Sequence, residues 1–136
     1  MTADLATLPL HGTAQRGPAD QGRHLHPAAL PHWRALLGLR WHEHYARVTA
    51  LSRDCDDARR AAARADGPDE CQAALARASA MWHRAVTQWR ALAEIEAALS
   101  RLGAGRFGWC QDCGAAIAAS RLTEIPQARY CPACDQ

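Results

Sequence analysis

Two cysteine pairs near the C-terminus constrain the fold of this 136-residue chain more than any other feature. Cys110 and Cys113 form one C-x-x-C pair, Cys131 and Cys134 form the other, and seventeen residues separate the two pairs. Two pairs at such a spacing can close a tetrahedral four-thiolate site around a single Zn²⁺. The alternatives are two disulfides or four free thiols. The spacing favours the metal, and we expect one structural Zn²⁺ bound by these four cysteines.

The segment that carries the cysteines, residues 103–136, is too short to bury a sufficient apolar core by itself. A structural zinc would supply the missing stability, about 10–16 kcal/mol for sites of this kind. We therefore predict a small C4 zinc-ribbon domain at 103–136. Four thiolates fill the coordination shell of zinc and leave no open position for catalysis. No nucleophile with a neighbouring base and no phosphate-binding loop is apparent elsewhere, so the sequence does not indicate an enzyme.

Residues 30–102 show the three- and four-residue apolar spacing of two long amphipathic helices. The pattern breaks once, at Ala65-Asp66-Gly67-Pro68, and each half is longer than an ordinary globular helix. Two such helices joined by a Gly-Pro turn predict an antiparallel coiled-coil hairpin. The predicted fold class is thus mainly α, a long coiled-coil hairpin followed by the zinc ribbon. Gly103 and Gly105 are expected to end the second helix.

Several side chains on these helices have a structural and a functional interpretation. Helical spacing places four tryptophans in the hairpin interface rather than at a base-stacking site: Trp33, Trp41, Trp82 and Trp89. Cys55 is expected to face inward, opposite the neighbourhood of Ser79. Cys71, near the start of the second helix, is the better candidate for redox chemistry. His42 and His44 point to different sides of a helix and cannot bind one ion together.

Composition and charge limit the partners and the compartment. Residues 1–29 lack a clear period and predict a flexible N-terminal arm. No stretch approaches the roughly 20 apolar residues of a membrane span, and the first residues do not resemble a secretory signal. We therefore expect a cytoplasmic protein without a membrane partner, in a compartment where thiols stay reduced. A net charge of +2 does not indicate general binding to polyanions.

The turn between the helices, residues 66–71, is acidic, with Asp66, Asp69 and Glu70 close together. Asp69 and Glu70 lie where a carboxylate complements the positive end of a helix dipole. Capping and solubility alone would account for these acids. A functional tip at the end of a long hairpin is the other interpretation.

Taken together, these motifs resemble the DksA/TraR family. The resemblance rests on the acidic turn at Asp66–Cys71, on Ile95-Glu96-Ala97-Ala98-Leu99, on Phe107-Gly108-Trp109-Cys110, and on the closing Cys131–Cys134 pair. It implies a monomer that binds bacterial RNA polymerase without sequence-specific DNA contacts. By this resemblance the hairpin enters the secondary channel, and Asp66 and Asp69 reach toward the active centre and weaken open complexes.

Two positions depart from the pattern of family members that respond to guanosine tetraphosphate. Those members carry Lys just before the Ile-Glu pair and Arg just before the proline of the zinc ribbon, whereas this chain has Glu94 and Ile125. The usual contacts to the nucleotide are therefore not expected. Two alternatives stay open: a zinc-ribbon module that binds nucleic acid, and a family relative that binds a different protein.

Overall fold

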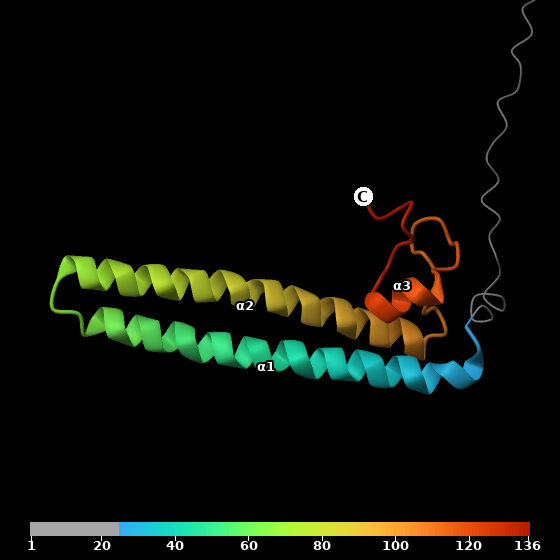
Figure 1. Cartoon of the computed structure of the whole chain (residues 1–136), viewed down its shortest axis with the longest axis horizontal. Helices are drawn as coiled ribbons and strands as arrows, with labels where there is room; N and C mark the ends of the chain where they lie inside the picture. Colours follow the sequence, from blue (N-terminus) through green and yellow to red (C-terminus); the bar gives the residue numbers. More distant parts are fainter. Residues whose placement is uncertain (1–24) are drawn as a thin grey trace, which may run out of the picture.

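The structure, a computed structural model, describes residues 25–136, so most of the predicted N-terminal arm lies outside the described residues. A short 3-10 turn, η1 (Pro27–Ala29), leads directly into α1 (Leu30–Ala63), which is followed by α2 (Pro68–Gly103) and α3 (Ala119–Glu124). The two long helices run antiparallel as a hairpin, and the C-terminal module, residues 104–136, packs at the base of α2 (Figure 1). The predicted hairpin followed by a cysteine module is confirmed. Among the helices of residues 25–136, none combines the length and the hydrophobicity that a transmembrane span requires.

The turn of the hairpin forms where the sequence pattern breaks. The last turn of α1 closes at Arg64, whose backbone N–H donates to the carbonyls of Arg60 and Ala61, both at 3.2 Å. Gly67 is extended (φ −149°, ψ 164°) and precedes Pro68, the first residue of α2. Proline is well suited to a first helical position because the N–H that it lacks would have no helical partner there. The connection is thus fixed by backbone chemistry and leaves its acidic side chains in solvent.

Glycine ends α2 as the sequence predicts, and the hydrogen bonds show how. Gly105 has φ +72°, and its N–H donates to the carbonyl of Leu102 at 3.3 Å. The N–H of the next residue, Arg106, donates to the carbonyl of Arg101 at 2.9 Å. This pair of bonds is a Schellman motif, which needs a residue in the left-handed region at the position of Gly105. The motif turns the chain sharply from the helix into the C-terminal module.

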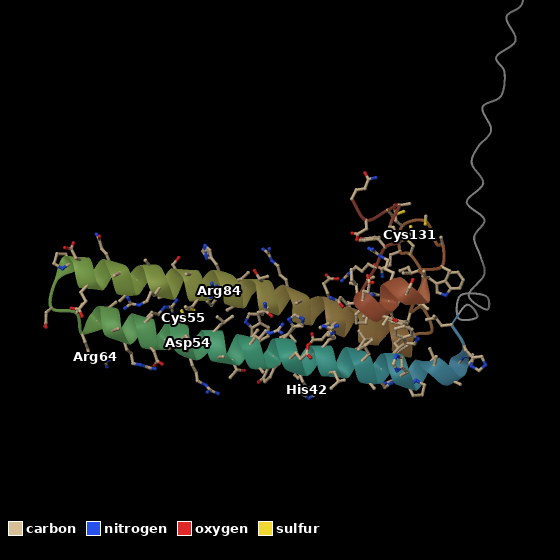
Figure 2. All side chains as sticks on the ribbon, viewed as in Figure 1. His42, Asp54, Cys55, Arg64, Arg84 and Cys131 are labelled. Atoms are coloured by element: carbon tan, nitrogen blue, oxygen red, sulfur yellow. The ribbon has the colours of Figure 1, made fainter. Side chains whose placement is uncertain are left out.

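Small residues fill the interface between α1 and α2 over its distal half. The buried residues of α2 there are alanines: Ala74, Ala78 and Ala85. They face Val48, Cys55 and Ala58 of α1. The thiol of Cys55 lies between the helices and donates to the carbonyl of Ala78 at 3.4 Å (Figure 2). The predicted inward position of Cys55, opposite residue 79, is therefore confirmed.

The prediction for two of the tryptophans is wrong. Trp33 is buried and Trp41 is partly buried, but Trp82 and Trp89 are 52% and 51% exposed. The period of the apolar pattern was correct, but α2 carries two adjacent apolar stripes, and the alanine stripe faces α1. Alanine at a helix interface permits close approach of the two backbones, which leaves no room for indole rings between them. The stripe that carries Trp82 and Trp89 therefore lies on the solvent-exposed side of α2.

One core joins the base of the hairpin to the C-terminal module. It combines side chains from both long helices with side chains of the module: Leu25, Trp33, Leu37, Ile95, Ala98, Leu102, Phe107, Cys110, Ile117 and Leu122. Leu37, Ile95, Ile117 and Leu122 are completely buried in it. The indole of Trp33 packs 5.9 Å from the ring of Phe107, measured between centroids. The module therefore shares its apolar core with α1 and α2.

Candidate metal centre and acidic tip

The four predicted cysteines converge on one point of the C-terminal module. Each offers one sulfur atom, and the four Sγ atoms of Cys110, Cys113, Cys131 and Cys134 all lie within 4.8 Å of one another. The Sγ atoms of Cys113 and Cys131 are 3.7 Å apart. A tetrahedral zinc site with Zn–S bonds of about 2.3 Å has S–S edges of about 3.8 Å. The sulfur positions therefore fit a single tetrahedral ion.

Backbone hydrogen bonds build the two turns that present the sulfurs. The N–H of Gly114 donates to the carbonyl of Cys110 at 3.0 Å, and Gly114 has φ +72°, which favours glycine. The N–H of Cys134 donates to the carbonyl of Cys131, also at 3.0 Å. A further bond from the Gln111 N–H to the Arg129 carbonyl, at 2.8 Å, ties the first turn to the second. The chain thus holds the four thiols together through its backbone.

The surroundings of Cys110 favour a thiolate, the form that binds metal. Burial raises the pKa of this thiol, but hydrogen bonds from the backbone N–H groups of Cys113, Cys131 and Asp112 outweigh it and lower the pKa to about 6. By contrast, the neighbouring thiols of Cys131 and Cys113 raise the pKa of Cys134. Four thiols this close resist full ionisation without a cation between them. A doubly charged cation between the sulfurs offsets the repulsion among the thiolates, and sulfur donors suit zinc.

A buried arginine fixes the C-terminal module against α2, a contact that the sequence analysis missed. Arg101 is only 5% exposed, and its Nη2 donates to the carbonyls of Gln127 and Ala128 at 3.3 and 3.5 Å. Burial, together with the nearby charge of Arg129, lowers the pKa of Arg101. The signal in the sequence was weak, because an arginine in the last turn of a helix is usually read as a surface residue that complements the helix dipole.

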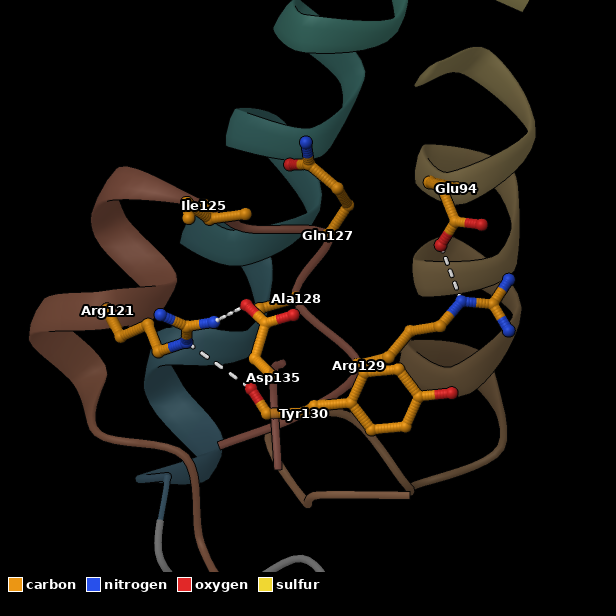
Figure 3. Close-up of a pocket in the computed structure, with 8 residues that line it drawn as sticks. All are labelled: Glu94, Arg121, Ile125, Gln127, Ala128, Arg129, Tyr130 and Asp135. Carbon is orange, nitrogen blue, oxygen red and sulfur yellow. Dashed lines mark hydrogen bonds and ion pairs between the residues drawn. The ribbon is translucent and has the colours of Figure 1, made fainter. Parts of the chain in front are cut away.

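A second contact between module and hairpin lies at a surface pocket of about 460 Å³ beside α2. Its lining includes both positions at which the sequence departs from the pattern that the resemblance implies, Glu94 and Ile125 (Figure 3). The Glu94 carboxylate binds the Nε of Arg129 at 2.5 Å. The other arginine of the pocket, Arg121, pairs with Asp135. Both cations that line this pocket are therefore neutralised from within the chain.

The acidic tip lies at the end of the hairpin opposite to the cysteines (Figure 1). Asp66, Asp69 and Glu70 are all exposed. Of the three side chains, Glu70 is the one with a hydrogen bond within residues 25–136: its Oε2 accepts from the backbone N–H of Asp66 at 3.2 Å. Within residues 25–136, neither Asp66 nor Asp69 forms an ion pair. The 36 residues of α2 span about 54 Å, so two free carboxylates are held far from the metal centre.

The two histidines and the cysteine that the sequence offers as further site residues, His42, His44 and Cys71, do not form a second site. His44 is partly buried and its Nδ1 lies 2.6 Å from the Oε1 of Gln88, while the Nδ1 of His42 lies 2.7 Å from the carbonyl of Gly38. The two histidines therefore do not meet at one site, as expected. Cys71 is partly exposed in the first turns of α2, and within residues 25–136 it forms no disulfide and belongs to no cluster of three or more metal-binding side chains.

Comparison with known proteins points in one direction. Residues 105–136 match the family described as the prokaryotic dksA/traR C4-type zinc finger. An uncharacterized protein of Aquifex aeolicus (strain VF5) is 44% identical over 43 residues, 32% of this chain, and the match spans only 30% of that relative's length. The structure is similar to that of transcription factor DksA2 from Pseudomonas aeruginosa, with a TM-score of 0.69 and 25% identity. That match covers 88% of this chain and 86% of the other. A C4-type module with four converging sulfurs holds one structural zinc ion.

Proposed function

Because the chain belongs to the DksA/TraR family, we propose that it is a DksA-like transcription factor that acts by binding bacterial RNA polymerase. The observation that carries the proposal is the similarity to DksA2 over 88% of the chain, since it includes the hairpin as well as the zinc-finger module. A shared zinc finger alone would leave the function open, because such modules occur in proteins of many kinds. The sequence offers no catalytic constellation to set against this assignment.

In this proposal the zinc is structural and is held by Cys110, Cys113, Cys131 and Cys134. The sulfur geometry supports the assignment, and the core shared with α1 and α2 gives the ion a function beyond the module. When bound, the ion neutralises the crowded thiolates and closes the module. The closed module then completes the packing around Ile95 and Leu37 at the base of the hairpin.

The hairpin would enter the secondary channel of the polymerase with its tip toward the active centre. Two features of the tip support this. The carboxylates of Asp66 and Asp69 are exposed and form no ion pair within residues 25–136, so their charges are free to act on another molecule. Glu70 instead stabilises the turn that presents them. We propose that the two aspartates modulate the stability of the open complex.

The proposed factor would act without the usual contacts to guanosine tetraphosphate. The family positions for Lys and Arg hold Glu94 and Ile125, and both residues line the pocket beside α2. Glu94 adds a negative charge there and also occupies Arg129. Arg121 is occupied by Asp135. A polyphosphate entering this pocket would meet a carboxylate and would have to break ion pairs before it gained any.

The same ion pairs weigh against the alternative of a nucleic-acid-binding zinc module. Two of the three arginines of the module, Arg121 and Arg129, are engaged with carboxylates rather than free for phosphates. Proteins that bind nucleic acid through phosphate contacts present unpaired basic side chains.

The decisive experiment measures binding to polymerase separately from the effect on the open complex. The dissociation constant for polymerase and the lifetime of the open complex at a sensitive promoter are measured for the wild type, Asp66→Asn and Asp69→Asn. Asp54→Asn, which removes an exposed carboxylate from α1 below the turn, is the matched control. We expect all four proteins to bind with similar affinity. The two tip variants alone should lose the effect on lifetime, because asparagine keeps the shape and capping ability of aspartate but not its charge.

Two results would refute the proposal. If the wild type does not bind polymerase, the function is wrong. If it binds but both tip variants regulate like the wild type, the aspartates only make the turn soluble and the mechanism is wrong. Binding to DNA that disappears after nuclease treatment would support the nucleic-acid alternative instead.

A further inference from the structure

The two cysteine turns of the metal centre are held in different ways, and the first is closed by the backbone. On either side of the turn Cys110–Cys113 the chain pairs with itself. Trp109 and Ala116 form an antiparallel bridge. The N–H of Cys110 donates to the carbonyl of Ala115 at 2.8 Å. These main-chain contacts join the residues before the first turn to the residues after it.

The second turn, Cys131–Cys134, has backbone hydrogen bonds inside it but none across its base. The N–H groups of Cys134 and Asp135 both donate to the carbonyl of Cys131, each at 3.0 Å. Among the residues that the structure describes, no backbone hydrogen bond joins Tyr130, which precedes this turn, to Asp135, which follows it. The two flanks of the second turn therefore depend on side chains or on the metal to stay together.

One guanidinium group contacts both flanks of the second turn (Figure 3). The Nε of Arg121 donates to the carbonyl of Tyr130 at 3.3 Å, and its Nη2 donates to the carboxylate of Asp135. A guanidinium is planar and carries its donors in a fixed arrangement, so the two contacts restrict how far Tyr130 and Asp135 can separate. Arg121 thus closes the base of the second turn, as backbone contacts close the base of the first.

The position of Arg121 is itself fixed by the core of the molecule. Arg121 lies in α3, and the next residue, Leu122, is completely buried in the core shared with α1 and α2. The carbonyl of Arg121 accepts a hydrogen bond from the N–H of Ile125 at 2.8 Å, which closes the helical turn. A side chain holds its partners most precisely when a rigid element carries it. Arg121 is therefore well placed to hold the second turn.

We propose that Arg121 is a positioning residue of the zinc centre. It is not one of the four ligands and acts through Tyr130 and Asp135, which adjoin Cys131 and Cys134 in the chain. Partners that orient the ligands of a metal typically change its affinity about 10–100-fold when they are mutated. By this route the packing of α3 in the core reaches two of the four sulfurs. The inference concerns the metal centre and does not depend on binding to polymerase.

The test measures the rate at which the full-length, zinc-loaded protein releases zinc to a coloured chelator. The variants are Arg121→Gln, Asp135→Asn and the double variant, with Arg121→Lys as the conservative substitution. Glu124→Gln, which removes an exposed charge from the same helix, is the matched control. Circular dichroism confirms that each variant is folded. If Arg121→Gln does not fold, Arg121→Lys and Asp135→Asn are compared with the wild type instead.

We expect Arg121→Gln to release zinc about tenfold faster than the wild type, and the control to release it at the wild-type rate. Asp135→Asn should have a smaller effect, because the hydrogen bond from Arg121 to Tyr130 remains. In the double variant the change at Asp135 should add nothing, since its partner is already absent. Arg121→Lys should lie between the wild type and Arg121→Gln, because an ammonium group can pair with Asp135 but lacks the planar fork.

Salt provides a readout that a mere loss of packing would not change. Arg121 and Asp135 are 21% and 55% exposed, so their pairing is screened as the Debye length falls from about 10 Å at 0.1 M salt to about 3 Å at 1 M. Zinc release from the wild type and the control should therefore accelerate with salt more than release from Arg121→Gln or Asp135→Asn.

Three results would overturn the proposal. The first is release from Arg121→Gln at the wild-type rate. The second is an effect of Asp135→Asn that persists in full without Arg121, because Asp135 would then act on its own. The third is an equal response of all the proteins to salt. A wild type that holds no zinc would refute the metal centre together with this inference.

Discussion

Replacement of Ile95 by alanine should weaken both the hairpin and the zinc centre, although Ile95 belongs to α2. Ile95 is completely buried in the core that joins α1, α2 and the C-terminal module. The substitution removes about 2.4 kcal/mol of transfer free energy at roughly 0.8 kcal/mol for each carbon group. The cavity left behind adds to this, so we expect a loss of about 3 kcal/mol in the free energy of unfolding, within the usual range of about 2–5 kcal/mol.

The assay has two readouts. Urea unfolding followed by helical circular dichroism gives the loss of stability, and release of zinc to a coloured chelator reports on the metal centre. Because Ile95 packs in the same core as Cys110, we expect zinc to leave at least about tenfold faster, equivalent to about 1.4 kcal/mol. Leu75→Ala, which trims a 52% exposed side chain of the same helix, should change neither readout appreciably. A destabilised hairpin with an unchanged rate of zinc release would refute the shared core.

Three further outcomes are expected. Cys113→Ser should lower the zinc content from about one ion per chain to well below one, measured by elemental analysis, because a four-thiolate site loses a ligand. Gly105→Ala should cost about 1–2 kcal/mol in thermal unfolding because its φ of +72° is left-handed, whereas Gly103→Ala, with no neighbouring atom in the way, should be neutral or slightly stabilising. Guanosine tetraphosphate should not enhance the wild type in transcription assays, and Glu94→Lys combined with Ile125→Arg should create a response, since each charged contact is worth roughly 1.5–3 kcal/mol. A strong response of the unmodified protein would contradict the last prediction.

The parts of the fold that local chemistry determines could be predicted from the sequence. The break at Gly67-Pro68 fixed the turn, and α1 and α2 begin and end within a few residues of the expected positions. The convergence of the cysteines follows from their spacing, because two C-x-x-C pairs at this separation are typical of a four-thiolate zinc site. The position of Cys55 opposite residue 79 is predictable because the turn of an antiparallel hairpin determines which residues face each other.

Two kinds of feature could not be predicted from the sequence: which of several side chains occupies an interface, and which distant segments contact each other. The spacing of Trp82 and Trp89 predicts a place in the interface, because large apolar residues usually occupy it, but the neighbouring alanine stripe permits a closer approach of the helices. The burial of Arg101 leaves no signal in the sequence, because its partners are the backbone carbonyls of Gln127 and Ala128 and not side chains. The pairing of Glu94 with Arg129 joins residues 35 positions apart and required the docked module.

The alanine interface of the distal hairpin also determines how thick the hairpin is. Helices separated by alanine can approach toward the lower end of the usual range of about 8–10 Å between axes. Beyond Val48, the buried residues of α1 and α2 are small: Cys55, Ala58, Ala74, Ala78 and Ala85. The distal part is therefore a slender rod with little buried apolar volume, and its local opening should be easier than that of the base. A narrow opening that excludes a coiled coil packed with leucine could admit this thinner hairpin. The diameter of the hairpin, as well as the charge of its tip, can therefore determine how far the tip reaches.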